Sequence, residues 1–260
     1  MLHERARALG KKLAWVRFFA GESKGSASGG TIASVLDLLD AAKADRGIRT
    51  LLANPYALDP DPARRGPDGP DQLGVRFDRE LGMWTGPFVM ATVNTRVVRR
   101  SNALLGNAYG PSFRYSESMS FGKGPKGFLT ASAVSAGLLA FVGAASLAPT
   151  RKLLQRTVLP APGEGPSKAA RDAGYFVIRF IAETEADGGA PVRLTGRVEG
   201  KSDPGYGETA KMLSQAAMCL ALDGDRIAPG GGVLTPASSM GMTLVERLRA
   251  ADMVFDVATV

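Results

Sequence analysis

The sequence contains only one cysteine and one histidine among 260 residues. The single cysteine, Cys219, excludes an internal disulfide and a cysteine-cluster metal site. The single histidine, His3, excludes a Ser-His-Asp hydrolase and a zinc site built from histidines. Cys219 lies in an apolar run, where a thiol usually acts as a small buried hydrophobic group.

The sequence also lacks a complete nucleotide-binding motif. Residues 28–31 (Ser-Gly-Gly-Thr) do not have the Gly-Lys-Ser/Thr ending of a phosphate-binding loop. Gly205-Tyr206-Gly207 supplies the first two glycines of a dinucleotide fingerprint but not the third. The first ten residues are charged and helical in character rather than a signal peptide, so we expect a cytoplasmic protein.

Charge and composition indicate a globular protein with a basic surface. Hydrophobic residues make up 45% and charged residues 22%, and the formal net charge is +7. We therefore expect a globular fold, and the length allows one large domain over residues 1–260 or two small ones. The basic residues form no long run and no basic–aromatic module, so nucleic acid is not an expected partner.

The periodicity of apolar residues predicts an α+β fold. The expected helices are 2–9, 31–44, 87–105, 209–222 and 235–251. The expected strands are 12–20, 113–121, 175–184, 192–200 and 254–257. Because strands and helices do not alternate strictly, we expect a mixed, mostly antiparallel sheet with helices packed on one face. Asp187-Gly188-Gly189 indicates a hairpin between two of the strands.

An apolar insertion is expected within residues 123–160. Residues 128–149 carry no charged side chain and are long enough to cross a bilayer. Basic residues flank the stretch on both sides, a pattern that favours a segment lying on or dipping into a membrane over one that crosses it. A buried helical hairpin, or an insertion packed on its own domain, is the alternative.

Two sets of residues are candidates for binding an anion. Ser28, Gly29, Gly30 and Thr31 precede a helix whose free backbone N–H groups would attract negative charge, although an ordinary capping loop has the same pattern. Arg96, Arg99 and Arg100, which follow Asn94, would share one helix face. They would bind either a phosphate group or the carboxylates of neighbouring acidic residues.

Two tyrosines are candidate pocket residues or proton donors. Tyr115 lies two residues before Glu117, so both side chains would share one face of a strand. Tyr206 lies near Lys211. Simple packing of each ring is the alternative, and the sequence identifies no catalytic residue and no metal ligand.

Several short motifs, in order along nearly the whole chain, resemble the saccharopine dehydrogenase-like oxidoreductases, in particular the bacterial trans-acting enoyl reductases. They are Ser28-Gly-Gly-Thr31, Asn54-Pro-Tyr56, Trp84-Thr-Gly-Pro-Phe88, Asn94-Thr-Arg96, Arg99-Arg-Ser-Asn102, Phe113-Arg-Tyr-Ser-Glu117, Gly165-Pro-Ser167, Gly205-Tyr206 and Leu234-Thr-Pro236.

The resemblance implies a two-part reductase, in which a Rossmann domain binds NADP(H) and a second α+β domain shapes the substrate pocket and forms a homodimer. The substrate would be a lipid-like acyl or polyketide chain with a double bond to be reduced. The motifs match the second domain, so we expect the cofactor domain to be missing and the chain alone to be inactive. A non-catalytic lipid- or membrane-binding module, peripheral to the inner face of the plasma membrane, is the alternative function.

Overall fold

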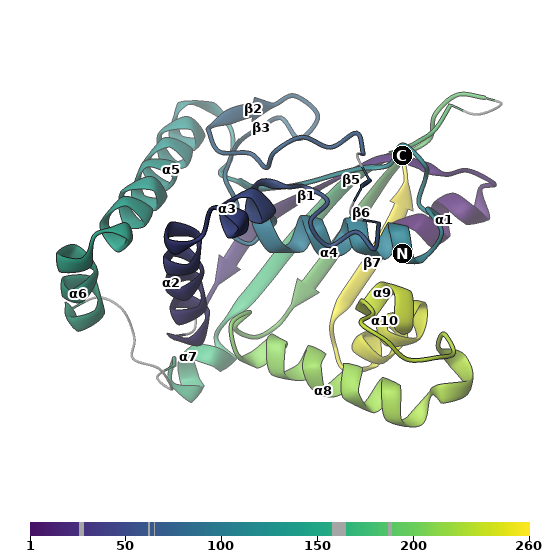
Figure 1. The fold of residues 1–260 in the computed structure, drawn as a ribbon. Coiled ribbons are helices and arrows are strands. Elements are labelled where there is room, and N and C mark those ends of the chain that lie inside the picture. The colour runs from purple at the N-terminus through teal and green to yellow at the C-terminus, as the bar shows by residue number, and fades with distance from the viewer. Residues whose placement is uncertain (26–28, 62, 65, 158–164, 187–188) are drawn as a thin grey trace.

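The computed structural model describes residues 1–25, 29–61, 63–64, 66–157, 165–186 and 189–260. It confirms the α+β class, because one mixed sheet is covered by helices (Figure 1). The hairpin signal at Asp187-Gly188 lies outside the described residues.

Seven strands form the sheet in the order β2-β3-β4-β1-β5-β6-β7. Their bounds are β1 Leu13–Lys24, β2 Arg76–Asp78, β3 Met83–Gly86, β4 Arg114–Ser120, β5 Tyr175–Thr184, β6 Arg193–Gly200 and β7 Val254–Thr259. Only β1 and β4 run parallel, and the other neighbours are antiparallel. The sheet is therefore mixed and mostly antiparallel, as the sequence predicts.

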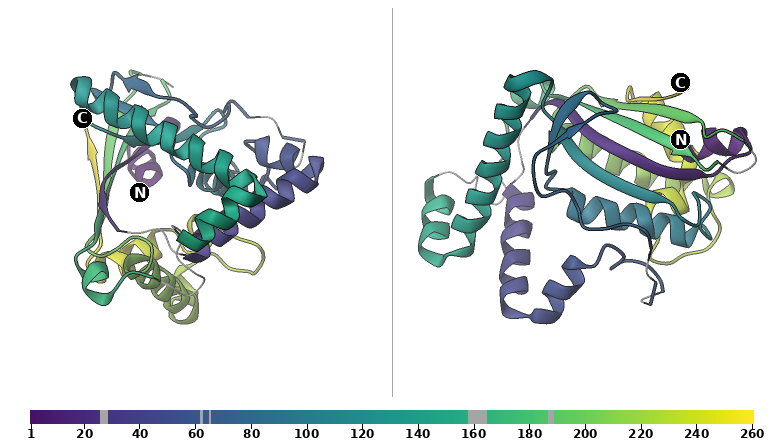
Figure 2. Two further views of the ribbon diagram at one scale, coloured as in Figure 1. Left: turned by 90° about the vertical axis from the view of Figure 1, so that its left-hand side faces the viewer. Right: turned by 90° about the horizontal axis from the view of Figure 1, so that it is seen from above.

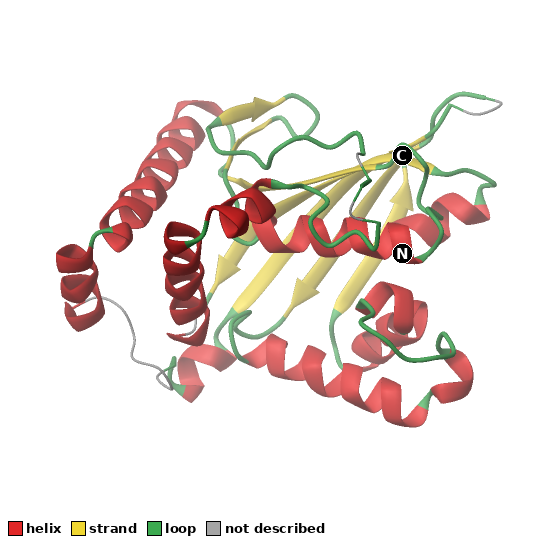
Figure 3. Cartoon of the chain, viewed as in Figure 1, coloured by secondary structure: helices red, strands yellow, loops and turns green. Residues whose placement is uncertain are grey.

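The helices flank this sheet, and Figure 2 shows them gathered on one side of it. Their bounds are α1 Leu2–Ala8, α2 Gly29–Ala44, α3 Arg46–Ala53, α4 Ala91–Leu104, α5 Gly124–Ser146, α6 Ala148–Thr157, α7 Lys168–Asp172, α8 Gly207–Leu222, α9 Pro236–Ser239 and α10 Gly241–Ala250, with a short 3-10 turn η1 at Gly224–Arg226. Loops connect most of them to the strands (Figure 3).

The helix predicted over 235–251 is two helices. Thr235 caps the first one as expected, and its side chain accepts a hydrogen bond from the backbone N–H of Ser238. The chain breaks at Gly241, whose φ of +50° lies in the left-handed region that favours glycine. This break lets α10 turn back against α8 and β7.

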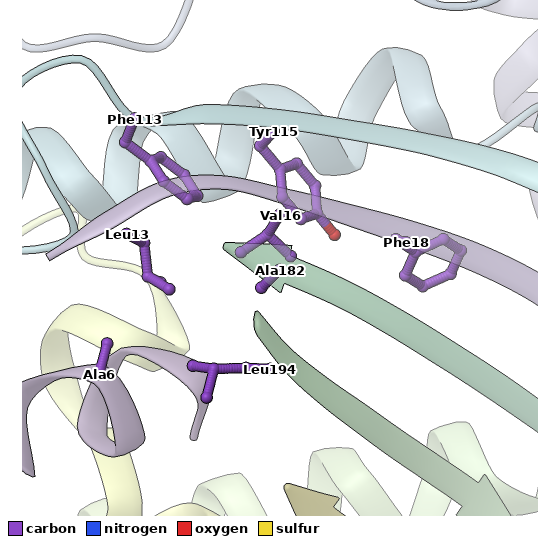
Figure 4. Close-up of a cluster of buried hydrophobic side chains, with 8 residues drawn as sticks. All are labelled: Ala6, Leu13, Val16, Phe18, Phe113, Tyr115, Ala182 and Leu194. Carbon is purple, nitrogen blue, oxygen red and sulfur yellow. The ribbon is translucent and has the colours of Figure 1, made fainter. Parts of the chain in front are cut away.

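The main core lies between the sheet and α1 and α4. Alternate residues of each strand point to this side, because side chains along a strand alternate between its two faces. Val16 of β1 is paired with Tyr115 of β4 on one side and with Ala182 of β5 on the other. The buried cluster comprises Ala6, Leu13, Val16, Phe18, Phe113, Tyr115, Ala182 and Leu194 (Figure 4).

The opposite face of the sheet is covered by arginine side chains rather than by helices. Arg17 of β1 lies over the rings of Trp15 and Phe19 and pairs with Asp78 at 2.5 Å. Arg179 and Arg197 occupy the neighbouring strands and pair with acidic residues. The long arginine stems shield apolar surface while their charged ends stay in water.

The apolar insertion is helical, and its helix α5 is mostly exposed. In the described part of the chain α5 is the one helix long and apolar enough to cross a membrane by length and composition. Only 17% of its most apolar window is buried. One side of the helix packs on β3 of its own domain, and contact of its exposed side with a membrane stays a prediction.

Candidate functional site

An apolar cavity of about 530 Å³ lies between the inner face of the sheet and helices α1, α4 and α10. Its volume is typical of small-molecule sites, which usually have a mostly apolar wall with a few polar groups. The wall residues from the sheet include Val16, Tyr115, Phe180 and Phe255, and those from the helices include Leu2, His3, Val98, Leu244 and Leu248. An apolar ligand would therefore contact side chains from both layers of the domain.

Tyr115 is the wall residue with the most distinctive chemistry. Its hydroxyl donates a hydrogen bond to Oε1 of Glu117 at 2.8 Å, so the two side chains share a strand face as predicted. Asn94 of α4 donates from Nδ2 to Oε2 of Glu117 at 3.0 Å. Figure 4 shows the Tyr115 ring among the core side chains of the inner face. These three residues form a short chain of hydrogen bonds, and Tyr115 is the member that lines the cavity.

Burial perturbs both acidic groups of this chain. Glu117 is 4% exposed, and loss of water raises the pKa of its carboxyl, although its hydrogen bonds with Tyr115 and Asn94 oppose the shift. Burial first, and the nearby Glu117 second, raise the pKa of the Tyr115 phenol well above its ordinary value. A buried carboxyl with a raised pKa beside a cavity is a typical feature of functional sites.

Arg99 is held by an acidic partner from the loop that precedes β2. Its Nε donates to Oδ2 of Asp68 at 2.6 Å, and both side chains are under one-tenth exposed. Arg99 also donates to the backbone carbonyl oxygens of Pro55 and Tyr115. Asp68 in turn accepts from the backbone N–H of Tyr115 at 3.1 Å. This network fixes the backbone on which the tyrosine sits.

Arg96 and Arg100 are also held by contacts within the chain. Arg96 is buried and forms an ion pair with Asp71. Arg100 donates to the backbone oxygens of Leu58 and Val233. Of the two alternatives that the sequence left open, the structure shows carboxylate pairing for Arg96 and Arg99, and contact of the three arginines with a substrate stays a prediction.

The segment 205–211 comprises a turn and the start of α8, and none of its residues is a wall residue of the cavity. Glu208 is fully buried and accepts hydrogen bonds from the Lys201 backbone at 3.0 Å and from Lys211 Nζ at 2.9 Å. Lys211 is thus paired with Glu208, and Tyr206 is not a wall residue of the cavity. A substrate-binding role of Tyr206 stays a prediction.

The glycines at the start of α2 also lie apart from the cavity. Ser28 lies outside the described residues, and α2 begins at Gly29, so Gly29, Gly30 and Thr31 form its first turn. Gly30 is exposed and is not a wall residue of the cavity. Anion binding at this helix end stays a prediction.

Sequence reasoning missed most of the cavity wall. His3 has a ring 5.1 Å from the Tyr109 ring, and burial lowers the pKa of its imidazole. Burial raises the pKa of Tyr109 to about 12. No spacing in the sequence could have predicted that α1 and α10 line one cavity. The two helices are more than 200 residues apart along the chain and come to the same cavity only after folding.

Gly207 and two of the arginines of α4 make structural contacts within the chain. An added Cβ at Gly207 would overlap the Ser202 hydroxyl, so the glycine serves close packing within the turn. Two of the three arginines of α4 are already neutralised by aspartates. In the described ranges there is also no group of His, Cys, Asp and Glu side chains that could hold a metal ion.

Several mycobacterial proteins are similar to this chain. A Mycobacterium tuberculosis protein, provisionally named a trans-acting enoyl reductase, is 45% identical over 239 residues, covering 88% of this chain and 55% of its own length. The trans-acting enoyl reductase of Mycobacterium bovis BCG is 40% identical over 241 residues, covering 87% of this chain and 55% of its own. That of Mycobacterium ulcerans is 36% identical over 232 residues, covering 85% of this chain and 54% of its own.

No protein-family model and no solved structure matches the chain. The chain spans about half the length of the curated relatives it matches. Over most of its own length, this chain is similar to proteins named trans-acting enoyl reductases.

Proposed function

We propose that this chain is the substrate-side domain of an NADP-dependent enoyl reductase, which reduces a double bond in a lipid or polyketide acyl chain. The observation that carries the proposal is the large apolar cavity in a chain 45% identical to a protein that bears this name. An acyl chain is apolar and flexible, and burial of each CH₂ group contributes about 0.8 kcal/mol. A cavity lined mainly by aliphatic and aromatic side chains suits such a ligand.

Tyr115 would supply a proton to the reduced substrate. In the present hydrogen-bond arrangement its O–H points to Glu117, so the phenol proton is not free. When Glu117 is protonated, its own O–H can donate to the Tyr115 oxygen and release the phenol proton for the cavity. The raised pKa of Glu117 favours that protonated form.

Reduction also needs a hydride, and we assign no hydride-transfer step to this chain. In this proposal NADP(H) is bound by a separate Rossmann domain, as the resemblance implies. We also propose that the domain forms a homodimer, which sedimentation equilibrium would test directly. The substrate domain would hold the acyl chain and position its reacting carbons.

Binding of a fluorescent fatty acid tests the substrate side of the proposal. We expect saturable binding by the wild type and about tenfold weaker binding by Leu244→Trp, because the larger ring would occupy the cavity. Leu213→Trp is the matched control, since Leu213 is 71% exposed on α8 and is not a wall residue. Absence of saturable binding, or equal loss in both variants, would contradict the proposal.

A non-catalytic lipid-binding module is the second candidate, favoured by the exposed apolar helix α5. Joining the chain to the cofactor half of a relative would separate the two functions. NADPH-dependent reduction of an enoyl thioester that is lost in Tyr115→Phe supports the reductase. Lipid binding without any reduction supports the module.

A further inference from the structure

Helix α5 is apolar along its length, yet the protein does not bury it. It has 23 residues and a mean hydropathy of 1.8 in its most apolar window. A helix that is hydrophobic all round is normally enclosed by a core or by lipid. Only 17% of that window is buried, so the rest of the domain covers only a small part of the helix surface.

One narrow side of α5 attaches it to the sheet. Its buried residues are Gly127, Ala131, Ser135 and Ala145. The Phe128 ring lies 4.8 Å from the Trp84 ring of β3, which anchors the first turns. Figure 1 shows the rest of the helix extending away from the sheet edge, with α6 at its far end.

Large apolar side chains remain exposed along the helix and just beyond it. They are Phe128, Leu129, Val134, Leu139, Val142 and Leu147. Leu129 and Leu139 are each 65% exposed. A soluble monomer rarely leaves an extended apolar patch of this kind in water, and such patches usually mark an interaction surface.

Along the sequence the charges next to α5 have one sign, while Arg151 of α6 pairs with Asp40 of the neighbouring helix α2. No acidic residue occurs between Glu117 and Glu164. Lys123 and Lys126 lie exposed at the start of the helix, and Lys152 lies exposed beyond its end. Each basic side chain near an anionic lipid surface contributes about 1 kcal/mol of attraction. An apolar surface with cations at both ends therefore matches the acyl region and the anionic headgroups of a bilayer.

The connections of α5 exclude a crossing. A helix that crossed would place α6 on the far side, and the chain would have to return to α7, which is hydrogen-bonded to the turn after β6 through the Arg171 carbonyl. A second crossing requires about 20 apolar residues in a helix. Only ten residues separate Thr157 from Lys168. The helix can therefore enter one leaflet or lie in its surface.

From this geometry we infer that α5 is a monotopic docking helix for an anionic lipid bilayer. Its exposed side is buried at the boundary of headgroups and acyl chains, and Lys123, Lys126 and Lys152 contact lipid phosphates. This inference is independent of the cavity and of the reductase proposal, because it concerns a different surface of the molecule.

Sedimentation of the 260-residue chain with vesicles tests the inference. We expect binding to phosphatidylcholine vesicles that contain phosphatidylglycerol and weaker binding to phosphatidylcholine alone. The double variant Leu129→Glu/Leu139→Glu should bind about tenfold or more weakly, since charged groups enter the acyl region at high cost. The variant Lys123→Gln/Lys126→Gln should lose the preference for phosphatidylglycerol.

Leu213→Glu/Leu222→Glu on α8 is the matched control, with side chains 71% and 64% exposed. It should bind as the wild type does, and circular dichroism should show the same melting temperature for all variants. No binding by the wild type, or equal loss in the α8 control, would overturn the inference. So would a soluble dimer that ignores vesicles and dissociates in the α5 variant, since the surface would then bind a second copy.

Discussion

At the residue scale, Arg99 is a candidate anion-binding residue in the sequence and makes structural contacts in the folded protein. Its guanidinium contacts Asp68, two backbone carbonyls and the Thr95 hydroxyl, and its side chain is 4% exposed. Buried charges of this kind are tolerated only when they are paired and fully hydrogen-bonded. The residue therefore joins the loop before β2 to α4 and β4.

Arg99→Ala should lower the free energy of unfolding by about 3–5 kcal/mol, because Asp68 would be left as an unpaired buried charge. Arg179→Ala is the control, since its pair with Glu22 is exposed and should contribute about 1 kcal/mol or less. Urea denaturation measures both. Similar small effects for the two variants would show that the Asp68 pair is not a structural requirement.

Glu117 predicts a particular pH dependence of stability. Because burial raises its folded-state pKa above the ordinary 4.5, the folded state holds this proton more tightly than the unfolded state does. The stability from this group is complete below pH 4.5 and is lost as the pH rises through the folded-state value. Glu117→Gln cannot ionise and should not show this loss.

The measurement is urea denaturation of both proteins at several pH values from 4.5 upward. The free energy of unfolding of the wild type should fall relative to that of Glu117→Gln as the pH rises. Parallel curves would mean that the carboxyl titrates equally in the folded and unfolded states.

At the scale of single elements, α5 has glycines with opposite roles. An added Cβ on Gly127 would overlap the backbone carbonyl of Gly122, so this glycine allows the helix to turn closely onto the chain that enters it. Gly137 has nothing within 4 Å of such a Cβ. The same substitution should therefore have different signs at two positions in one helix.

Gly127→Ala should destabilise the protein by about 1–3 kcal/mol through overpacking. Gly137→Ala should stabilise it by about 0.5–1 kcal/mol, because alanine loses less backbone freedom on helix formation. Thermal unfolding followed by circular dichroism compares the two directly. Equal shifts in melting temperature would contradict the assigned contact at Gly127.

For the whole molecule, the arrangement of layers separates two surfaces. The helices lie on one side of the sheet (Figure 2). The apolar cavity lies on that side, while ion-paired arginines cover the other. The cavity wall consists mainly of aliphatic and aromatic side chains. Arg96 and Arg99 of α4 are paired with aspartates. The described residues therefore offer an apolar cavity of a size typical of small-molecule sites.

The isolated chain should accordingly bind a fatty acid but show no saturable binding of NADPH and no NADPH oxidation. Titration followed by NADPH fluorescence measures the first, and absorbance at the nicotinamide band measures the second. A known NADPH-dependent reductase serves as the positive control. Saturable NADPH binding by this chain would contradict the assignment of the cofactor to a separate domain.

Much of the fold could be predicted because local patterns determine local structure. The alternation around Tyr115 and Glu117 predicted their common strand face, and Thr235-Pro236 predicted a helix start. The split at Gly241 was missed, because apolar spacing continues across the break and only the left-handed φ interrupts the helix.

The sequence by itself determined the fold class, the exclusion of metal sites built from clustered cysteines or histidines, and the motifs shared with trans-acting enoyl reductases. Only the tertiary structure decided which acidic residues neutralise Arg96 and Arg99, where the cavity lies, and that α5 is exposed. The physical reason is that periodicity reports which face of an element is apolar. What that face contacts depends on partners that are distant along the chain and adjacent only after folding.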